Sequence, residues 1–91
     1  MERSEYYPHI QSTIRVFMNT FQSNAISVLD VGCRDGYATS LLRKFGYRAI
    51  GMEIEKEFVL YARKQGRPVI HGDAMNIPFS NCFDVVYTRH V

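Results

Sequence analysis

The sequence lacks a long apolar run and a strong charge of either sign. Its longest uninterrupted apolar stretch is far shorter than a membrane-spanning helix, so no transmembrane segment is predicted. The first residues, MERSEYY, are polar and charged where a secretory signal has an apolar core. The net charge of +2 comes without a basic run or basic–aromatic interleaving, which leaves nucleic-acid binding unsupported. We therefore expect a cytoplasmic protein without a membrane partner.

Cysteine is scarce as well. The two cysteines, Cys33 and Cys82, lack the spacing of a metal site and fit reduced thiols of a cytosolic chain, so neither a disulfide nor a metal centre is predicted. With 91 residues, 46% of them hydrophobic and 22% charged, the chain has the composition of one soluble globular domain over residues 1–91. A chain this short buries only about 60 to 65% of its unfolded surface, and we expect modest stability.

A strand, a glycine loop and a helix are predicted over residues 26–37, ISVLDVGCRDGY. The apolar run stops at Gly32, and a helical pattern restarts two residues after Gly36. These two glycines permit a tight turn and let a ligand approach the main chain without meeting a Cβ atom. Asp30 stands at the carboxyl end of the strand, where open α/β sheets bind their ligands. An ordinary strand–turn–helix of any α/β protein is the alternative.

The glycine spacing argues against a dinucleotide. The fingerprint G-x-G-x-x-G, started at Gly32, requires glycine at positions where the chain has Arg34 and Tyr37. The carboxylate of Asp30 would also repel a pyrophosphate, whereas it complements an ammonium group and a sulfonium cation. An NAD-dependent oxidoreductase fragment is therefore the weaker hypothesis.

The rest of the chain alternates helical and extended patterns. Apolar residues at helical spacing predict an amphipathic helix that starts at Pro8, closes at Ser23 and Asn24, and covers the sheet. Two strand–helix units in succession imply a parallel sheet with right-handed crossovers. After the glycine loop we predict helices from 38 to Gly46 and from 55 to Gly66, strands over 47–54, 68–71 and 83–88, and a loop over 73–82, the last strand being buried by Val85 and Val86.

Three acidic residues stand at or just beyond the carboxyl ends of successive strands, namely Asp30, Glu53 and Asp73. A lone carboxylate near a loop is usually just solvated. Parallel strands, however, present their carboxyl ends at one edge of the sheet, where the ligand crevice opens. Three carboxylates in register along that edge therefore indicate a binding site.

The glycine loop resembles the first motif of class I S-adenosylmethionine (SAM) methyltransferases, D-x-G-x-G-x-G. Asp30, Gly32 and Gly36 match this motif, and Arg34 stands in place of the middle glycine. The likeness continues through GMEI, HGDAMNIPF and FDVVYTRHV and so covers most of the chain. The sequence looks like the N-terminal half of such an enzyme, closest to the small-molecule type known as methyltransferase type 11.

The resemblance implies both a fold and a function. The fold is α/β, a Rossmann-like three-layer arrangement around a parallel sheet truncated to about four strands in the order 3-2-1-4, with a leading N-terminal helix. The function is that of a SAM-dependent methyltransferase, which transfers the methyl group by in-line displacement at sulfur to an acceptor that the sequence does not identify. His90, just after the last strand, is the best-placed candidate for a general base.

The resemblance also implies a set of cofactor-binding residues. They are Asp30, Gly32, Cys33, Gly36, Glu53, Ile54, Asp73 and Ala74. Asp30 and the Gly32 backbone would hold the methionine end of SAM. Because Arg34 replaces a glycine that allows close approach, its long cationic side chain would crowd the site or disfavour the sulfonium.

The adenosine part of SAM would be held by residues that follow the second and third strands. Glu53 would accept both ribose hydroxyl hydrogens, a role that suits a carboxylate because it accepts two hydroxyls at once. Ile54 would line one face of adenine. Asp73 would accept from the adenine amino group, and Ala74 would offer its backbone N–H to the ring.

The length of the chain is the larger departure from the family. Such enzymes usually continue through three more strands, so the strand over 83–88 becomes an edge, which is a known association hazard. We therefore expect either a homo-oligomer that forms through this edge or a marginally folded monomer. The alternative function is a non-catalytic SAM-binding or interaction module that lacks the substrate-binding half.

Overall fold

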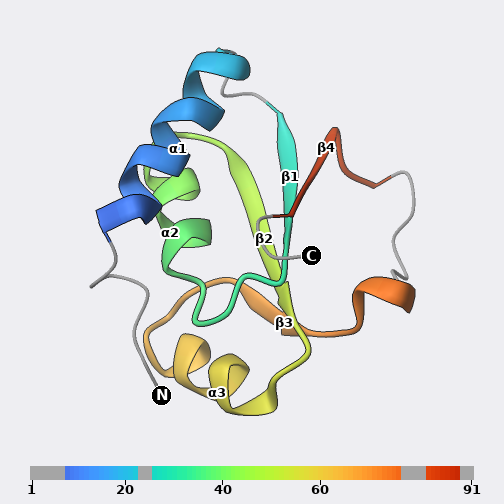
Figure 1. Ribbon diagram of the computed structural model, residues 1–91. Helices are drawn as coiled ribbons and strands as arrows, with labels where there is room; N and C mark the ends of the chain where they lie inside the picture. Colours follow the sequence, from blue (N-terminus) through green and yellow to red (C-terminus); the bar gives the residue numbers. More distant parts are fainter. Residues whose placement is uncertain (1–7, 23–25, 77–81, 89–91) are drawn as a thin grey trace.

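The computed structural model describes residues 8–22, 26–76 and 82–88. Helices and strands alternate along the chain (Figure 1). The elements are α1 (Pro8–Thr20), β1 (Ser27–Val31), α2 (Tyr37–Lys44), β2 (Arg48–Glu53), α3 (Lys56–Lys64), β3 (Val69–His71), the 3₁₀ turn η2 (Ala74–Asn76) and β4 (Val85–Thr88). The predicted closure of α1 at Ser23 and Asn24 lies outside the described residues.

The four described strands form one parallel sheet in the order β3-β2-β1-β4. Leu29 of β1 is level with Ile50 of β2 and with Val86 of β4, and Glu53 of β2 is level with His71 of β3. The Rossmann-like α/β fold and its strand order are therefore as predicted. Because all strands run the same way, their carboxyl ends meet at one edge, and the glycine loop lies there.

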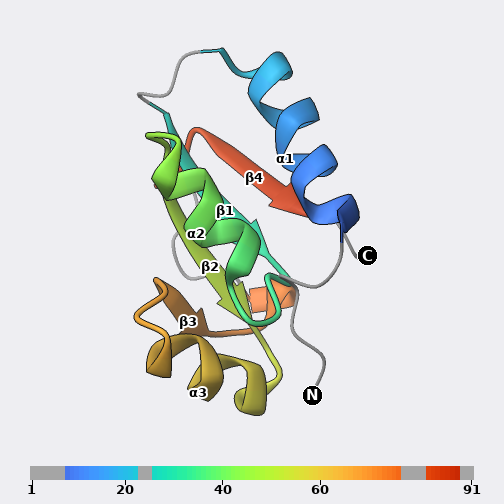
Figure 2. The ribbon, with the colours of Figure 1, turned by 90° about the vertical axis from the view of Figure 1, so that its left-hand side faces the viewer.

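All three helices pack on the same face of the sheet (Figure 2). Val28 and its register partner Ala49 join the core cluster with α1 and α2. Val69, whose register partner is Gly51, packs with Val59 and Ala62 of α3. Register partners point to the same side of a sheet, so α1, α2 and α3 form a single layer. Of the three layers expected, the described residues contain two, namely the sheet and this layer of helices.

An aromatic cluster centred on Phe17 joins α1 to the sheet. The Phe17 ring contacts the ring of Phe21, which follows α1. It also makes edge-on contacts with Tyr47 and Tyr87, whose ring centroids lie 5.2 and 5.1 Å away. The hydroxyl of Tyr47 donates to the Phe21 carbonyl. The predicted apolar stripe of α1 therefore packs against Tyr47, directly before β2, and against Tyr87 of β4.

The opposite face of the sheet has a smaller apolar cluster. Leu29, Val31 and Met52 are buried there, with Phe83 packed against them. The expected burial of the Val85 and Val86 pair is wrong for Val86, which is 54% exposed. Neighbouring residues of a strand point to opposite faces, so only Val85 turns toward the helices.

The start of β4 is held to the start of β1 by Asp84 and Ser27. The Asp84 carboxylate accepts from the Ser27 amide at 2.8 Å and from its hydroxyl at 3.2 Å. These hydrogen bonds, the backbone one first, hold the pKa of Asp84 below its ordinary value of 3.8 because they favour the charged form. The stabilisation is therefore fully present above that ordinary value and is lost as the pH falls through the lowered pKa of the folded state.

No helix within the described ranges is long and apolar enough to cross a membrane. Among the described strands, β4 pairs only with β1 and so forms an edge. The self-association expected at this edge stays a prediction.

We expect Val86→Lys to shift the chain toward monomer, because a charge on an edge strand opposes pairing with a second copy. Sedimentation velocity over a concentration series measures the effect. Leu60→Lys, at an equally exposed apolar position on α3, is the matched control and should leave the distribution unchanged. A wild-type chain that stays monomeric at every concentration would rule out association through β4.

Candidate functional site

The loop over residues 32–36 connects β1 to α2 and folds over the end of β2. The amides of Gly32 and Cys33 both donate to the carbonyl of Met52, at 2.8 and 3.2 Å. The Gly36 amide donates to the Cys33 carbonyl at 3.0 Å and closes the turn. The Cys33 side chain is buried with the apolar cluster of α3 and β3, so this residue offers the site its backbone and not its thiol.

Gly36 meets two separate requirements for glycine. Its φ of +75° is in the left-handed region, and a Cβ atom at this position would lie 2.5 Å from Cγ2 of Val69. Gly66, in the turn after α3, has nearly the same φ of +74° but no atom within 4 Å of such a Cβ. A substitution at Gly66 would therefore cause backbone strain alone, whereas one at Gly36 would cause the same strain and a steric clash.

We expect Gly36→Ala to lower the free energy of unfolding by about 1–3 kcal/mol more than Gly66→Ala, because only Gly36→Ala overpacks a buried neighbour. Urea titration of both variants measures the difference. Equal losses would mean that Val69 moves aside at no cost and that the loop does not rest on β3.

Arg34 replaces the middle glycine of the motif but keeps a glycine-like backbone. Its φ is +54°, and it is the non-glycine residue with positive φ within the described ranges. Its amide donates to Oε1 of Glu53 at 2.7 Å, and its guanidinium carbon lies 6.0 Å from the ring centroid of Phe58 on α3. The side chain is thus placed over α3. The crowding of the site that the sequence predicts for Arg34 stays a prediction.

We expect Arg34→Gly to be more stable than Arg34→Ala by about 1 kcal/mol. Both changes remove the contact with Phe58, but only glycine adopts the positive φ without strain. Thermal and urea unfolding of the two variants give the comparison. If alanine proves as stable as glycine, the loop has another conformation in solution.

Glu53 joins the end of β2 to the loop and to the start of α3. Its Oε1 accepts from the Arg34 amide, and its Oε2 accepts from the Glu55 amide at 2.9 Å. The residue is only 5% exposed. A carboxylate has about four acceptor positions, so two remain after these bonds.

Asp30 occupies a deeper position than the other two acidic residues. It is fully buried and accepts from the hydroxyl of Thr39 on α2 at 2.7 Å. In register it is level with Gly51, two residues before Glu53 along β2. The structure therefore brings Glu53 to the edge and turns Asp30 toward α2.

The segment after β3 returns to the end of β2. The Gly72 amide donates to the Glu53 carbonyl at 3.0 Å. Asp73 uses Oδ1 to accept from the Met75 amide at 2.9 Å, at the start of η2, in which Ala74 is the first residue. Ile54, just beyond β2, is 56% exposed. His90 lies outside the described residues.

Sequence reasoning missed Asp35 and Arg67. Asp35 is fully buried within the loop, and its Oδ1 accepts from the Tyr37 amide at 3.2 Å. Arg67, from the turn before β3, donates to the Asp35 carbonyl at 3.0 Å. The place of Asp35 directly before Gly36 in the glycine loop was a weak signal, and no local pattern marks Arg67.

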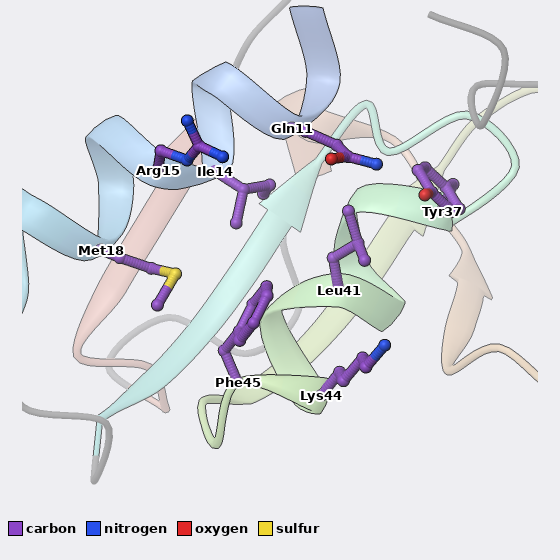
Figure 3. A pocket seen from close by; sticks show the side chains of 8 residues that line it. All are labelled: Gln11, Ile14, Arg15, Met18, Tyr37, Leu41, Lys44 and Phe45. Atoms are coloured by element: carbon purple, nitrogen blue, oxygen red, sulfur yellow. The ribbon is translucent and has the colours of Figure 1, made fainter. Parts of the chain in front are cut away.

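A groove of about 370 Å³ lies between α1 and α2 (Figure 3). Its lining residues are Gln11, Ile14, Arg15, Met18, Tyr37, Leu41, Lys44 and Phe45. Among them, Tyr37 directly follows the glycine loop, and Phe45 lies at the far end of α2. The groove therefore runs along the two helices, and its Tyr37 end adjoins the glycine loop.

A family model described as a methyltransferase domain matches residues 29–91. The chain belongs to the methyltransferase domain family. The resemblance to class I SAM-dependent methyltransferases is thus confirmed. No significant match is found among the curated proteins.

Solved structures have the same fold. The PH0226 protein from Pyrococcus horikoshii OT3 is 26% identical, with a TM-score of 0.82 over 93% of this chain and 43% of that one. The magnesium protoporphyrin IX methyltransferase ChlM from Synechocystis PCC 6803, with bound SAH, is 17% identical, with a TM-score of 0.71 over 88% of this chain and 41% of that one. CalS10, a SAM-bound amino pentose methyltransferase from Micromonospora echinaspora, is 21% identical, with a TM-score of 0.66 over 90% and 35%. This methyltransferase-family chain spans less than half the length of each.

Proposed function

We propose that this chain binds SAM at the carboxyl edge of its sheet and serves an enzyme that transfers the methyl group of SAM to an acceptor. The observation that carries the proposal is the set of hydrogen bonds of Glu53. Its carboxylate joins the end of β2 to the glycine loop, and two of its acceptor positions remain for a ligand. The family assignment supports it. So do the two solved methyltransferases of the same fold, one with bound SAH and one with bound SAM.

The residues at the carboxyl end of β2 and those that follow β2 and β3 suit the adenosine part of SAM. The remaining acceptor positions of Glu53 suit the two ribose hydroxyls. Ile54 offers an exposed apolar surface to one face of adenine. Asp73 has one oxygen engaged by Met75, so the other suits the adenine amino group, and Ala74 at the start of η2 would offer its backbone N–H.

The loop over residues 32–36 would hold the methionine end. Gly32 and Gly36 have no side chain and that of Cys33 is buried, so these residues would leave the backbone accessible to the ligand. We propose that Asp30, buried beneath the loop, favours the cationic methionine end through its negative potential and not by direct contact. The guanidinium of Arg34 lies over Phe58, which keeps this cation on the α3 side.

When bound, SAM supplies a methyl group on a positively charged sulfur. Methyl transfer depends chiefly on positioning, and the hydrogen-bonded loop together with Glu53 would supply this for the cofactor. His90 stays the candidate base predicted from the sequence, and a cytoplasmic location likewise stays a prediction.

A non-catalytic SAM-binding or interaction module is the second candidate. The contacts of Glu53 support cofactor binding, which this candidate shares with the enzyme. Transfer of a labelled methyl group to candidate acceptors separates the two. Incorporation of label supports the enzyme, whereas SAM binding without incorporation supports the module.

We expect Glu53→Ala to weaken SAM binding by more than about 1.5 kcal/mol, roughly tenfold or more, because charge-assisted hydrogen bonds to two hydroxyls are lost. Isothermal titration with SAM measures this, and NAD should give no binding heat. Glu55→Gln, an exposed neighbour that would keep its amide bonded to Glu53, is the control with unchanged affinity. An unchanged dissociation constant for Glu53→Ala would exclude this site.

A further inference from the structure

Arg67 connects three elements around the glycine loop. Its Nη1 donates to the Asp35 carbonyl at 3.0 Å and lies 3.8 Å from Oδ2 of the same residue. Its guanidinium carbon lies 5.6 Å from the ring centroid of Tyr37 on α2 and 5.8 Å from that of Tyr61 on α3. The side chain is only 11% exposed, and Asp35 is fully buried. The cation is therefore partly desolvated and held by both charge and ring contacts.

The backbone of Arg67 is itself held in place. Its amide donates to the Ala62 carbonyl at the end of α3 at 2.9 Å, and the Val69 amide donates to its carbonyl at 3.0 Å. A Cβ atom on Gly36 would lie 3.4 Å from the Cβ of Arg67. A residue whose backbone is hydrogen-bonded to α3 and β3 therefore reaches across to the loop beside Gly36.

We propose that Arg67 is a positioning residue for the cofactor, acting through Asp35 to hold the glycine loop in its binding conformation. The inference rests on the proposed function for its ligand, but the contact between Arg67 and Asp35 does not. Arginine suits this role because its planar guanidinium donates in a fixed direction while it stacks on aromatic rings, which a lysine ammonium does not do. The loop carries the methionine end of SAM, so Arg67 should matter for that end and not for the adenosine end.

The test compares Arg67→Met, Arg67→Lys and Asp35→Asn with Arg63→Met, which removes an exposed arginine from the last turn of α3. Two measurements are made on each variant of the 91-residue chain. Amide hydrogen exchange without ligand reports opening of the loop at Gly36 and Tyr37, relative to Val28 in β1. Isothermal titration gives the dissociation constants of SAM and of adenosine.

We expect Arg67→Met to raise exchange at Gly36 and Tyr37 by about tenfold relative to Val28, which matches the loss of one charge-assisted hydrogen bond. SAM should bind about tenfold more weakly, whereas adenosine should change by no more than about twofold. Arg67→Lys should lie between Arg67→Met and the wild type. Asp35→Asn keeps the carbonyl acceptor and should have a smaller effect than Arg67→Met, and Arg63→Met should have none.

A uniform rise in exchange at Gly36, Tyr37 and Val28, with SAM and adenosine weakened equally, would show that Arg67 only stabilises the fold and would overturn the proposal. If Arg67→Met does not fold, Arg67→Lys decides the same question by the ratio of SAM to adenosine affinity and by loop exchange. A wild-type chain that binds no SAM would refute the proposed function. The exchange at Gly36 and Tyr37 would then still decide whether Arg67 holds the loop.

Discussion

The contact between Gly36 and Val69 is the constraint on which the carboxyl edge of the sheet depends. A side chain at position 36 would meet Val69 at 2.5 Å, so the loop lies directly against β3 only because glycine is present. That closeness brings the Asp35 carbonyl within reach of Arg67 and the Arg34 amide within reach of Glu53. The loop is thereby joined to β2 and to the turn before β3 by hydrogen bonds that a wider gap would prevent.

Buried acidic residues gather around this loop. Asp30 and Asp35 are fully buried and Glu53 nearly so, and each accepts a hydrogen bond from a hydroxyl or an amide. A carboxylate removed from water is costly unless such partners are present. The hydrogen bonds of these three residues are therefore a condition of their burial.

The contacts that shape this edge all join residues between β1 and η2. They lie well inside the part of the chain that is similar to larger methyltransferases, although the chain spans only 43% of PH0226. The cofactor side of the proposed site is therefore built from this chain's own residues. The exposed side of Val86 and the unpaired side of β4 lie at the end of the strand order away from β3.

The sequence by itself determined the alternation of strands and helices, the place of the glycine loop, and the positions of Glu53 and Asp73 after their strands. These features depend on local periodicity and on backbone preference, both of which are set by residues close together in the sequence. Only the tertiary structure decided that Val86 is exposed, that Asp30 turns to Thr39, and that Arg67 reaches Asp35. Each of these depends on a face of the sheet or on a contact between segments far apart in the chain, and no local pattern contains that information.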